Sequence, residues 1–261
     1  MRLRKPNFEF SQQEEPENET EMKCRTYEVT TITPIFGGGV EAGVPDEELP
    51  IRATAIRGQL RYWWRFLTSY RKENPITDHK ELFKLERKIW GGMGQKGEDF
   101  ASKVSIHISN VKAPKIEPCY EYSRNGINEN GNPRYYERFL HGIPAYALFC
   151  GKGKKPHERS APEVPGDKEA DVILAGLQFT LTVKTLDAAL PNEDWELVLE
   201  SIRWWANFGG IGARTRRGLG SVAVETIIPL TNEDVEKYGC QYTDVSRQRY
   251  YTRIESSAVD G

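Results

Sequence analysis

The chain has 261 residues, of which 38% are hydrophobic and 28% charged, and its formal net charge is -2 at pH 7. These totals predict a folded protein of one large or two small domains with long polar insertions. A near-neutral charge spread evenly over the surface would argue against nucleic-acid binding, but here the charge is segregated. Residues 51–72 and 201–224 contain arginines and no carboxylate, whereas acidic residues gather near the start of the chain and at 46–48.

The four cysteines lie far apart and form no C-x-x-C pair, and no histidines follow at zinc-finger spacing. A disulfide framework and a structural zinc site are therefore not supported. The first residues lack the apolar run of a signal peptide, and no stretch approaches ~18 apolar residues. We expect a cytoplasmic protein that needs no metal and no cofactor.

The hydrophobic pattern predicts alternating strands and helices over residues 23–228, preceded by a flexible acidic arm at 1–22 and followed by a C-terminal extension at 229–261. Strand residues alternate with a period of two, whereas helix residues recur at i, i+3, i+4 and i+7. The predicted elements are, in chain order, a strand over 25–36, helices over 53–70 and 78–90, strands over 103–111 and 179–183, a helix from 191–194 to 208, and a strand over 221–228.

Residues 112–170 are rich in proline, glycine, asparagine and lysine, which predicts insertion loops within the domain. Only residues 146–150 have a strand-like pattern there. Without this insertion, the order is strand, helices, strand, strand, helix, strand. That order predicts an α+β fold of the ferredoxin-like (βαββαβ) class with long loop insertions. RNA-recognition modules share the plan (RRM-like), which leaves one sheet face and its loops available for RNA.

Two Gly-apolar-Gly turns bracket three arginines between the last predicted helix and the last predicted strand, from Gly210 to Gly220. Glycines permit positive φ and a close approach of the main chain to a ligand, and guanidinium groups bind phosphate, so the segment predicts an anion site. A dinucleotide-binding turn would follow a strand and open a helix, and no Walker motif is present, which favours a polynucleotide backbone. The alternative is a helix C-cap with solvated arginines.

Arginines also recur at i, i+4 and i+8 on the predicted helix 53–70, with no acidic partner one turn away. Such a face repels itself unless an anion lies on it, although a solvated helix face is the alternative. The tryptophans between these arginines are expected to pack in the core more than to stack on bases. The predicted RNA-binding residues are Arg52, Arg57, Arg61, Arg65, Gly37, Gly38, Gly39, Gly210, Gly212, Arg214, Arg216, Arg217, Gly218 and Gly220.

Catalysis has less support in the sequence. His141 or Tyr136 is a candidate general base for a metal-independent ribonuclease, but each residue type is more often structural. No paired carboxylates at metal-binding spacing lie near the basic segments, which disfavours a two-metal nuclease. We therefore expect no catalytic residue, and keep a metal-independent endoribonuclease and a purely architectural subunit as alternatives.

Several separated motifs resemble one family. Gly210-Ile211-Gly212-x5-Gly218-Leu219-Gly220 resembles the glycine-rich signature of the RAMP superfamily of CRISPR systems. The blocks at 33–39, 51–65 and 89–91 are similar, more narrowly, to the first RAMP subunits of Cmr (type III-B) complexes, and they occur in the same order.

The resemblance implies a ferredoxin-like RAMP fold and a place in a ribonucleoprotein that acts in antiviral defense. Such subunits help to bind target RNA near the 3′ end of the guide RNA, and they bind RNA without cleaving it. It also implies single-stranded RNA and other RAMP subunits of the complex as partners. Family members commonly carry a second ferredoxin-like half, for which residues 112–170 and the C-terminal tail are the candidates.

Overall fold

The structure is a computed structural model, and it describes residues 22–40, 44–93, 100–127, 129, 133–148 and 170–238. Its strands are β1 (Cys24–Thr31), β2 (Ile35–Phe36), β3 (Val104–Ser109), β4 (Ile116–Pro118), β5 (Tyr120–Ile127), β6 (Pro133–Phe139), β7 (Asp171–Ile173), β8 (Gln178–Thr185) and β9 (Val222–Val224). Its helices are α1 (Ala53–Tyr70), α2 (His79–Trp90), α3 (Asn192–Phe208) and α4 (Asn232–Lys237), with two short 3-10 turns, η1 (Ala145–Leu148) and η3 (Thr215–Arg217). Residues 1–21 of the expected arm and residues 239–261 of the expected extension lie outside the described residues.

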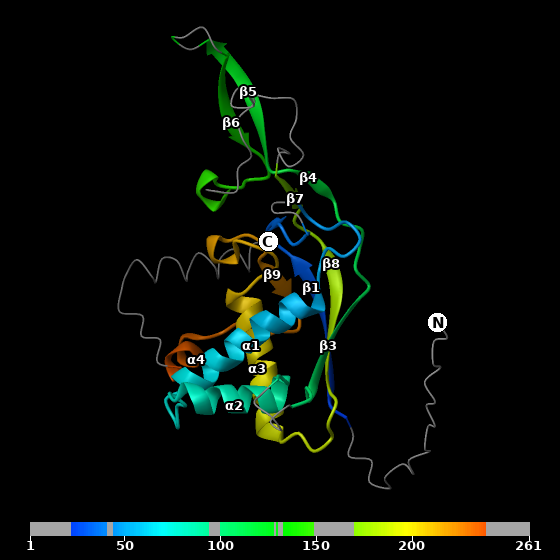
Figure 1. The fold of residues 1–261 in the computed structure, drawn as a ribbon, viewed down its shortest axis with the longest axis vertical. Coiled ribbons are helices and arrows are strands. Elements are labelled where there is room, and N and C mark those ends of the chain that lie inside the picture. Colours follow the sequence, from blue (N-terminus) through cyan, green and yellow to red (C-terminus); the bar gives the residue numbers. More distant parts are fainter. Residues whose placement is uncertain are drawn as a thin grey trace, which may run out of the picture.

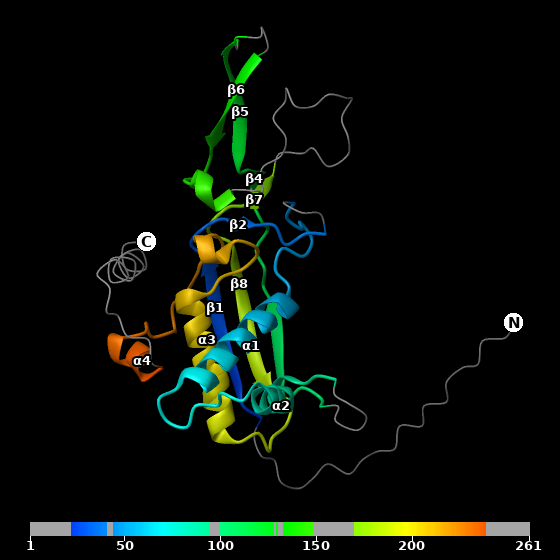
Figure 2. The same ribbon diagram turned by 60° about the vertical axis from the view of Figure 1, so that its left-hand side comes forward.

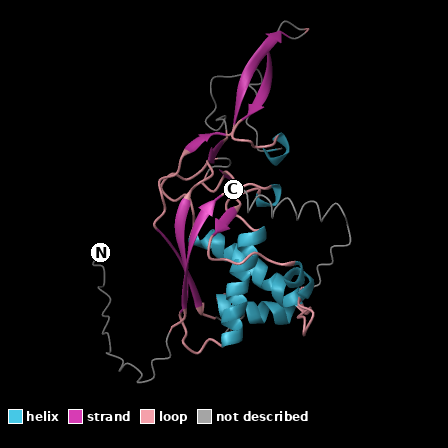
Figure 3. Cartoon of the chain, turned by 180° about the vertical axis from the view of Figure 1, so that it is seen from behind, coloured by secondary structure: helices cyan, strands magenta, loops and turns pink. Residues whose placement is uncertain are grey.

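The main lobe is a layer of helices on one face of an antiparallel sheet. The strand order is β3-β8-β1-β9, and every neighbouring pair is antiparallel. Figure 3 shows strands and helices as two layers, and Figure 2 shows α1 and α3 side by side on the sheet. Leu181 of β8, Leu60 of α1 and Ile202 of α3 are fully buried in one core between the layers. Apolar residues at alternate strand positions and along one stripe of each helix therefore build this lobe.

A second lobe extends from one end of the sheet (Figure 1). It contains a three-stranded sheet with the order β2-β7-β4 and an antiparallel hairpin of β5 and β6. A separate core holds it together, and Cys119, Tyr120, Leu148 and Val172 are fully buried there. The chain is thus a mixed α+β protein whose two lobes have separate cores.

The expectation of insertion loops over 112–170 is wrong for the described part of that range. Residues 116–118, 120–127 and 133–139 form strands β4, β5 and β6. The backbone N–H and C=O groups of β5 and β6 form hydrogen bonds with each other in the hairpin. A hairpin of this kind does not require the alternation of apolar and polar residues that identifies a half-buried strand in a sequence.

The expected strand at residues 146–150 is also wrong. Residues 145–148 form the 3-10 turn η1, in which the Ala147 N–H donates to the Pro144 carbonyl. Ala147 and Leu148 are adjacent in sequence, and both are fully buried in the second core. Proline fixes φ at a helical value and suits the start of such a turn. Phe149 and Cys150 lie outside the described residues.

The main-lobe helices agree closely with the sequence, and the last strand does not. Helix α1 has the predicted bounds, and α2 begins after Asp78, whose carboxylate accepts the Lys80 N–H at 3.0 Å. The predicted strand 221–228 shortens to β9, because β9 pairs only with the end of β1. Among the helices of the described residues, none is long and apolar enough to cross a membrane.

Helix α4 closes the far end of the main lobe. Its Val235 is buried in a third cluster with Leu67 of α1 and Trp204 of α3. Arg203 of α3 donates to the carboxylate of Asp234 and to the Pro229 carbonyl, so the chain after β9 is fastened to α3. This part of the sequence carries its own signal, since Thr231 and Asp234 form a reciprocal capping box.

The Arg203–Asp234 pair predicts a stability that depends on pH. The hydrogen bond from Arg203 lowers the pKa of Asp234 from 3.8 to about 2. Because the folded pKa is depressed, the contribution is complete above about pH 4 and is lost as the pH falls towards 2. Asp234→Asn should therefore lower the free energy of unfolding by on the order of 1–2 kcal/mol at pH 7, and by much less at pH 2. Urea unfolding of both proteins at the two pH values measures this, and an equal difference at both values would contradict it.

Candidate nucleic-acid interface

The segment from Gly210 to Gly220 forms a closed loop between α3 and β9. The Ile211 N–H donates to the Gly220 carbonyl at 2.8 Å, which joins the two ends of the loop. Gly220 has a φ of +66°, and a Cβ at this position would overlap the Ile211 carbonyl oxygen. A Cβ on Gly210 would lie 2.8 Å from the Gly220 carbonyl oxygen. Glycine is therefore required at both ends because two stretches of backbone touch.

The same loop is fastened to residues 34–36, which immediately precede the predicted glycine run at 37–39. The Gly220 N–H donates to the Pro34 carbonyl and the Ala213 N–H to the Phe36 carbonyl, both at 2.8 Å. A Cβ on Gly212 would lie 2.6 Å from the Cγ2 atom of Ile35. The two glycine-rich segments predicted from the sequence, which are far apart in the chain, therefore lie side by side.

The apolar residues between the glycines enter different cores. Ile211 is buried in the core of the main lobe, and Leu219 is buried in the core of the second lobe. Ile35 and Phe36 of β2 divide in the same way between the two cores. The loop therefore connects the two lobes structurally. The sequence predicted an anion site here and did not predict this structural role.

This role changes how the glycines can act in binding. The N–H groups of Gly218 and Gly220 already donate to the carbonyls of Thr215 and Pro34. Phosphate contacts from these two amides would require the loop to open. A Cβ on Gly38 or Gly218 would meet nothing within 4 Å, so open space for a ligand near the backbone lies at these two positions. The capacity to bind an anion therefore rests mainly on the arginine side chains.

The three arginines of the loop lie on and beside the short turn η3. Arg214 precedes the turn with a φ of +64°, a left-handed conformation that turns the chain sharply. Arg216 is exposed, and Arg217 is half-buried. Nη1 of Arg217 donates to the Tyr146 carbonyl at 2.9 Å, and its Cζ lies 4.8 Å from the centre of the Tyr146 ring. A turn that is rigidly attached to both cores therefore presents a cluster of positive charge.

The arginines of α1 are held differently. Nε of Arg61 and Nη1 of Arg65 both donate to Oε1 of Glu86, at 2.7 Å and 2.8 Å. Glu86 lies on α2, and its side chain is only 1% exposed. No acidic partner lies one turn away on α1, as expected, but the inference that the face needs an external anion is wrong for two of its three arginines. The partner comes from another helix, and spacing along α1 alone contains no information about it.

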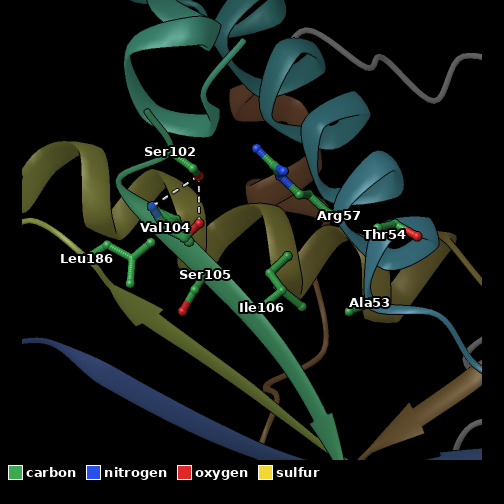
Figure 4. A pocket seen from close by; sticks show the side chains of 8 residues that line it. All are labelled: Ala53, Thr54, Arg57, Ser102, Val104, Ser105, Ile106 and Leu186. Atoms are coloured by element: carbon green, nitrogen blue, oxygen red, sulfur yellow. Dashed lines mark hydrogen bonds between the residues drawn. The ribbon is translucent and has the colours of Figure 1, made fainter. Parts of the chain in front are cut away.

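Arg57, the third arginine of this face, lines a pocket of about 280 Å³ between α1 and β3 (Figure 4). Its Nε is buried and has no hydrogen-bond partner within the described part of the chain. Burial and the neighbouring Arg61 cation lower the pKa of Arg57. The pocket is lined by Ala53, Thr54, Arg57, Ser102, Val104, Ser105, Ile106 and Leu186. Of the three arginines, Arg57 is thus the one whose placement suits an external anion.

The predicted basic residues do not form the facing walls of one cleft. Arg57 lies beside β3, one edge strand of the main sheet, and the glycine-arginine loop leads into β9, the opposite edge strand. An RNA that contacts both sets has to cross from one edge to the other. Arg52 is paired with Asp46 of the acidic loop at 2.8 Å.

The open face of the sheet does not resemble a base-reading surface. The row Thr26, Thr182 and His107 crosses it, and Thr180 donates to Glu28 in the next row. Apart from the imidazole of His107, these side chains are threonines and a glutamate, whereas RNA-recognition modules stack bases on two or three aromatic residues of this face. Trp64 and Trp205 are buried in the main core, as expected. RNA contacts are therefore expected at the loops and not on the open face.

The candidate general bases lie in the second lobe. Nε2 of His141 is 3.1 Å from the Pro118 carbonyl and 3.3 Å from Oε2 of Glu117. Tyr136 is on β6, opposite Ser123 of β5, and its side chain lies outside the described part of the structure. These contacts give His141 a structural position that does not depend on a substrate.

Two glycine substitutions distinguish the steric clash in the closed loop from the cost of a positive φ alone. Gly220→Ala should destabilise the protein by at least about 3 kcal/mol, because the new methyl group overlaps the Ile211 carbonyl. Gly218→Ala is the matched control and should cost about 1 kcal/mol, because only its positive φ of +85° is unfavourable there. Thermal and urea unfolding measure both values. Equal losses would show that the closed loop is not required.

Two arginine substitutions distinguish a structural arginine from a free one. Arg61→Ala should lower the free energy of unfolding by about 2 kcal/mol, because it removes one of two donors to the buried Glu86 carboxylate. Arg57→Ala should change it by less than about 0.5 kcal/mol. Melting curves at neutral pH test this, and a larger loss for Arg57→Ala would contradict the assignment.

Comparisons with known proteins agree with the resemblance seen in the motifs. A Cmr subunit of Pyrococcus furiosus, described as "CRISPR system Cmr subunit Cmr1-2", is 24% identical over 202 residues, which cover 77% of this chain and 95% of that protein. The crystal structure of Cmr1 from Pyrococcus furiosus in its apo form is 18% identical, with a TM-score of 0.43 over 90% of this chain and 60% of that one. A chain of the Type III-B Cmr-beta complex bound to cognate target RNA is 16% identical, with a TM-score of 0.49 over 91% and 63%. The chain therefore spans about three fifths of these two solved chains. The RAMP superfamily matches residues 28–223, and the chain belongs to this superfamily.

Proposed function

We propose that the chain is an RNA-binding RAMP subunit of a type III-B CRISPR ribonucleoprotein, in which it helps to bind target RNA and contributes to antiviral defense. The observation that carries the proposal is the cluster of Arg214, Arg216 and Arg217 on a loop that both cores hold in place. Guanidinium groups on a loop whose backbone is held in place suit a phosphate backbone, because little loop entropy is lost on binding.

Family membership and the Cmr relative support this assignment. The relative is described as a Cmr subunit, and this chain covers nearly all of it. The partners that follow from this are single-stranded RNA, either target RNA or the 3′ end of the guide RNA, and the other Cmr subunits. A ribonucleoprotein of this kind acts in the cytoplasm.

The strand order supports a ferredoxin-like main lobe. Without the second lobe, the elements of the main lobe run β1, helices, β3, β8, α3 and β9. Their spatial order β9-β1-β8-β3 is therefore fourth, first, third and second, with all neighbours antiparallel. This is the arrangement that a βαββαβ unit produces when its two crossovers lie on one face. We infer that RNA meets this unit at its loops.

We propose that the site binds RNA without cleaving it. The charged loop offers guanidinium groups, which stabilise phosphates but do not take up a proton at neutral pH. His141, the alternative general base, is engaged by Pro118 and Glu117. Incubating the purified chain with CRISPR repeat RNA in EDTA tests this. Intact RNA is expected, and specific cleavage that His141→Ala abolishes would favour the endoribonuclease.

The binding role predicts a dependence on charge and salt. Arg216→Ala should weaken the binding of single-stranded RNA a few-fold and lower the slope of log affinity against log salt by about one. Arg216→Lys should keep most of the slope because it keeps the charge. Arg25→Ala removes an exposed arginine of β1 and is the matched control. Fluorescence anisotropy over a salt series measures all four proteins. No RNA binding by the wild-type chain, or equal effects of Arg216→Ala and Arg25→Ala, would refute the proposal.

A further inference from the structure

An exposed tyrosine of the second lobe lies against the glycine-arginine loop. Tyr146 belongs to η1, and 73% of it is exposed. The next two residues, Ala147 and Leu148, are fully buried in the second core and fix the backbone of the turn. Figure 1 and Figure 2 both show η1, the green turn below the hairpin, beside the orange turn η3. An aromatic surface and a cationic surface from distant parts of the chain therefore meet.

Arg217 contacts this tyrosine in two ways. Its Nη1 donates to the Tyr146 main-chain oxygen at 2.9 Å, and its guanidinium carbon lies 4.8 Å from the ring centre. A cation over the ring restrains the ring's orientation. Since most of the residue remains exposed, the contact orients the ring and leaves most of its surface accessible.

An exposed aromatic ring beside arginines can bind single-stranded nucleic acid. Nucleic-acid bases stack on aromatic rings, and each such contact stabilises binding by about 1–3 kcal/mol irrespective of the base. The phosphates next to a stacked base need cations at short range, which Arg214 and Arg216 can supply from the same turn. In a duplex, both faces of a base are covered by its neighbours in the stack, so only an unpaired base can use the ring.

We propose that Tyr146 is a stacking residue for an unpaired RNA base, placed so that the adjoining phosphates contact the arginines around η3. The proposal rests on the proposed function and deepens it. It assigns RNA contacts to both lobes, and it makes the site selective for single-stranded RNA over duplex RNA.

The test uses the full-length chain and three RNA probes of equal length: oligouridylate, an abasic ribose-phosphate oligomer, and an RNA with one fluorescent aminopurine base. Tyr146→Ala should weaken oligouridylate binding about tenfold and leave abasic binding unchanged. Tyr146→Phe should bind like wild type, and Tyr146→Leu should be as weak as the alanine variant. Wild type and Tyr146→Phe should quench the aminopurine base, which reports stacking directly. Tyr70→Ala, another exposed tyrosine variant, is the control and should bind like wild type.

The other outcomes would contradict either the stacking role of Tyr146 or the proposed function. Wild-type affinity of Tyr146→Ala for oligouridylate would refute the stacking role while leaving the arginine site intact. An equal loss on oligouridylate and the abasic oligomer would show that Tyr146 only positions Arg217. If wild type binds none of the probes, the proposed function itself fails. Melting curves of the Tyr146 variants should match wild type because the side chain is exposed, and a lower melting temperature would assign Tyr146 to the fold instead.

Discussion

The backbone of Gly220 lies against the backbone of Ile211, and this close contact controls how the two lobes are joined. It closes the loop between α3 and β9, and closure places Ile211 in the main core and Leu219 in the second core. Any side chain at Gly220 would force the two backbone segments apart. Because the same loop carries three arginines, the requirement for glycine fixes the join between the lobes and the position of the charge together.

Two groups of arginines that look alike in the sequence have different physical roles. Arg61 and Arg65 neutralise the buried carboxylate of Glu86 and so hold α1 to α2. A buried carboxylate without its partners would be costly, so these residues belong to the fold before they belong to any ligand. Arg216 and Arg57 lie where an external anion can reach them. The surface that these arginines offer to an external anion is therefore smaller than the basic segments suggest.

The sequence predicts features whose signal is local. The bounds of α1 follow from its apolar stripe, and the start of α2 follows from the cap at Asp78. The pairing of Glu86 with α1, the neighbouring positions of the two glycine segments, and the contact of Arg217 with Tyr146 all depend on tertiary structure. The sequence did not predict the hairpin of β5 and β6, because its strands pair with each other and lack the apolar alternation of a strand that packs on a core. Turn-forming residues at 128–133 between two tyrosine-rich stretches were the signal that could have revealed it.

We propose that RNA contacts the glycine-arginine loop and the adjoining turn of the second lobe, and not the open face of the sheet. Photochemical crosslinking of the full-length chain to single-stranded RNA, followed by mapping of the linked peptides, distinguishes these surfaces. We expect crosslinks within residues 210–220 and at Tyr146. Crosslinks confined to the exposed residues of β1, β3 and β8, such as Thr26 and His107, would contradict it.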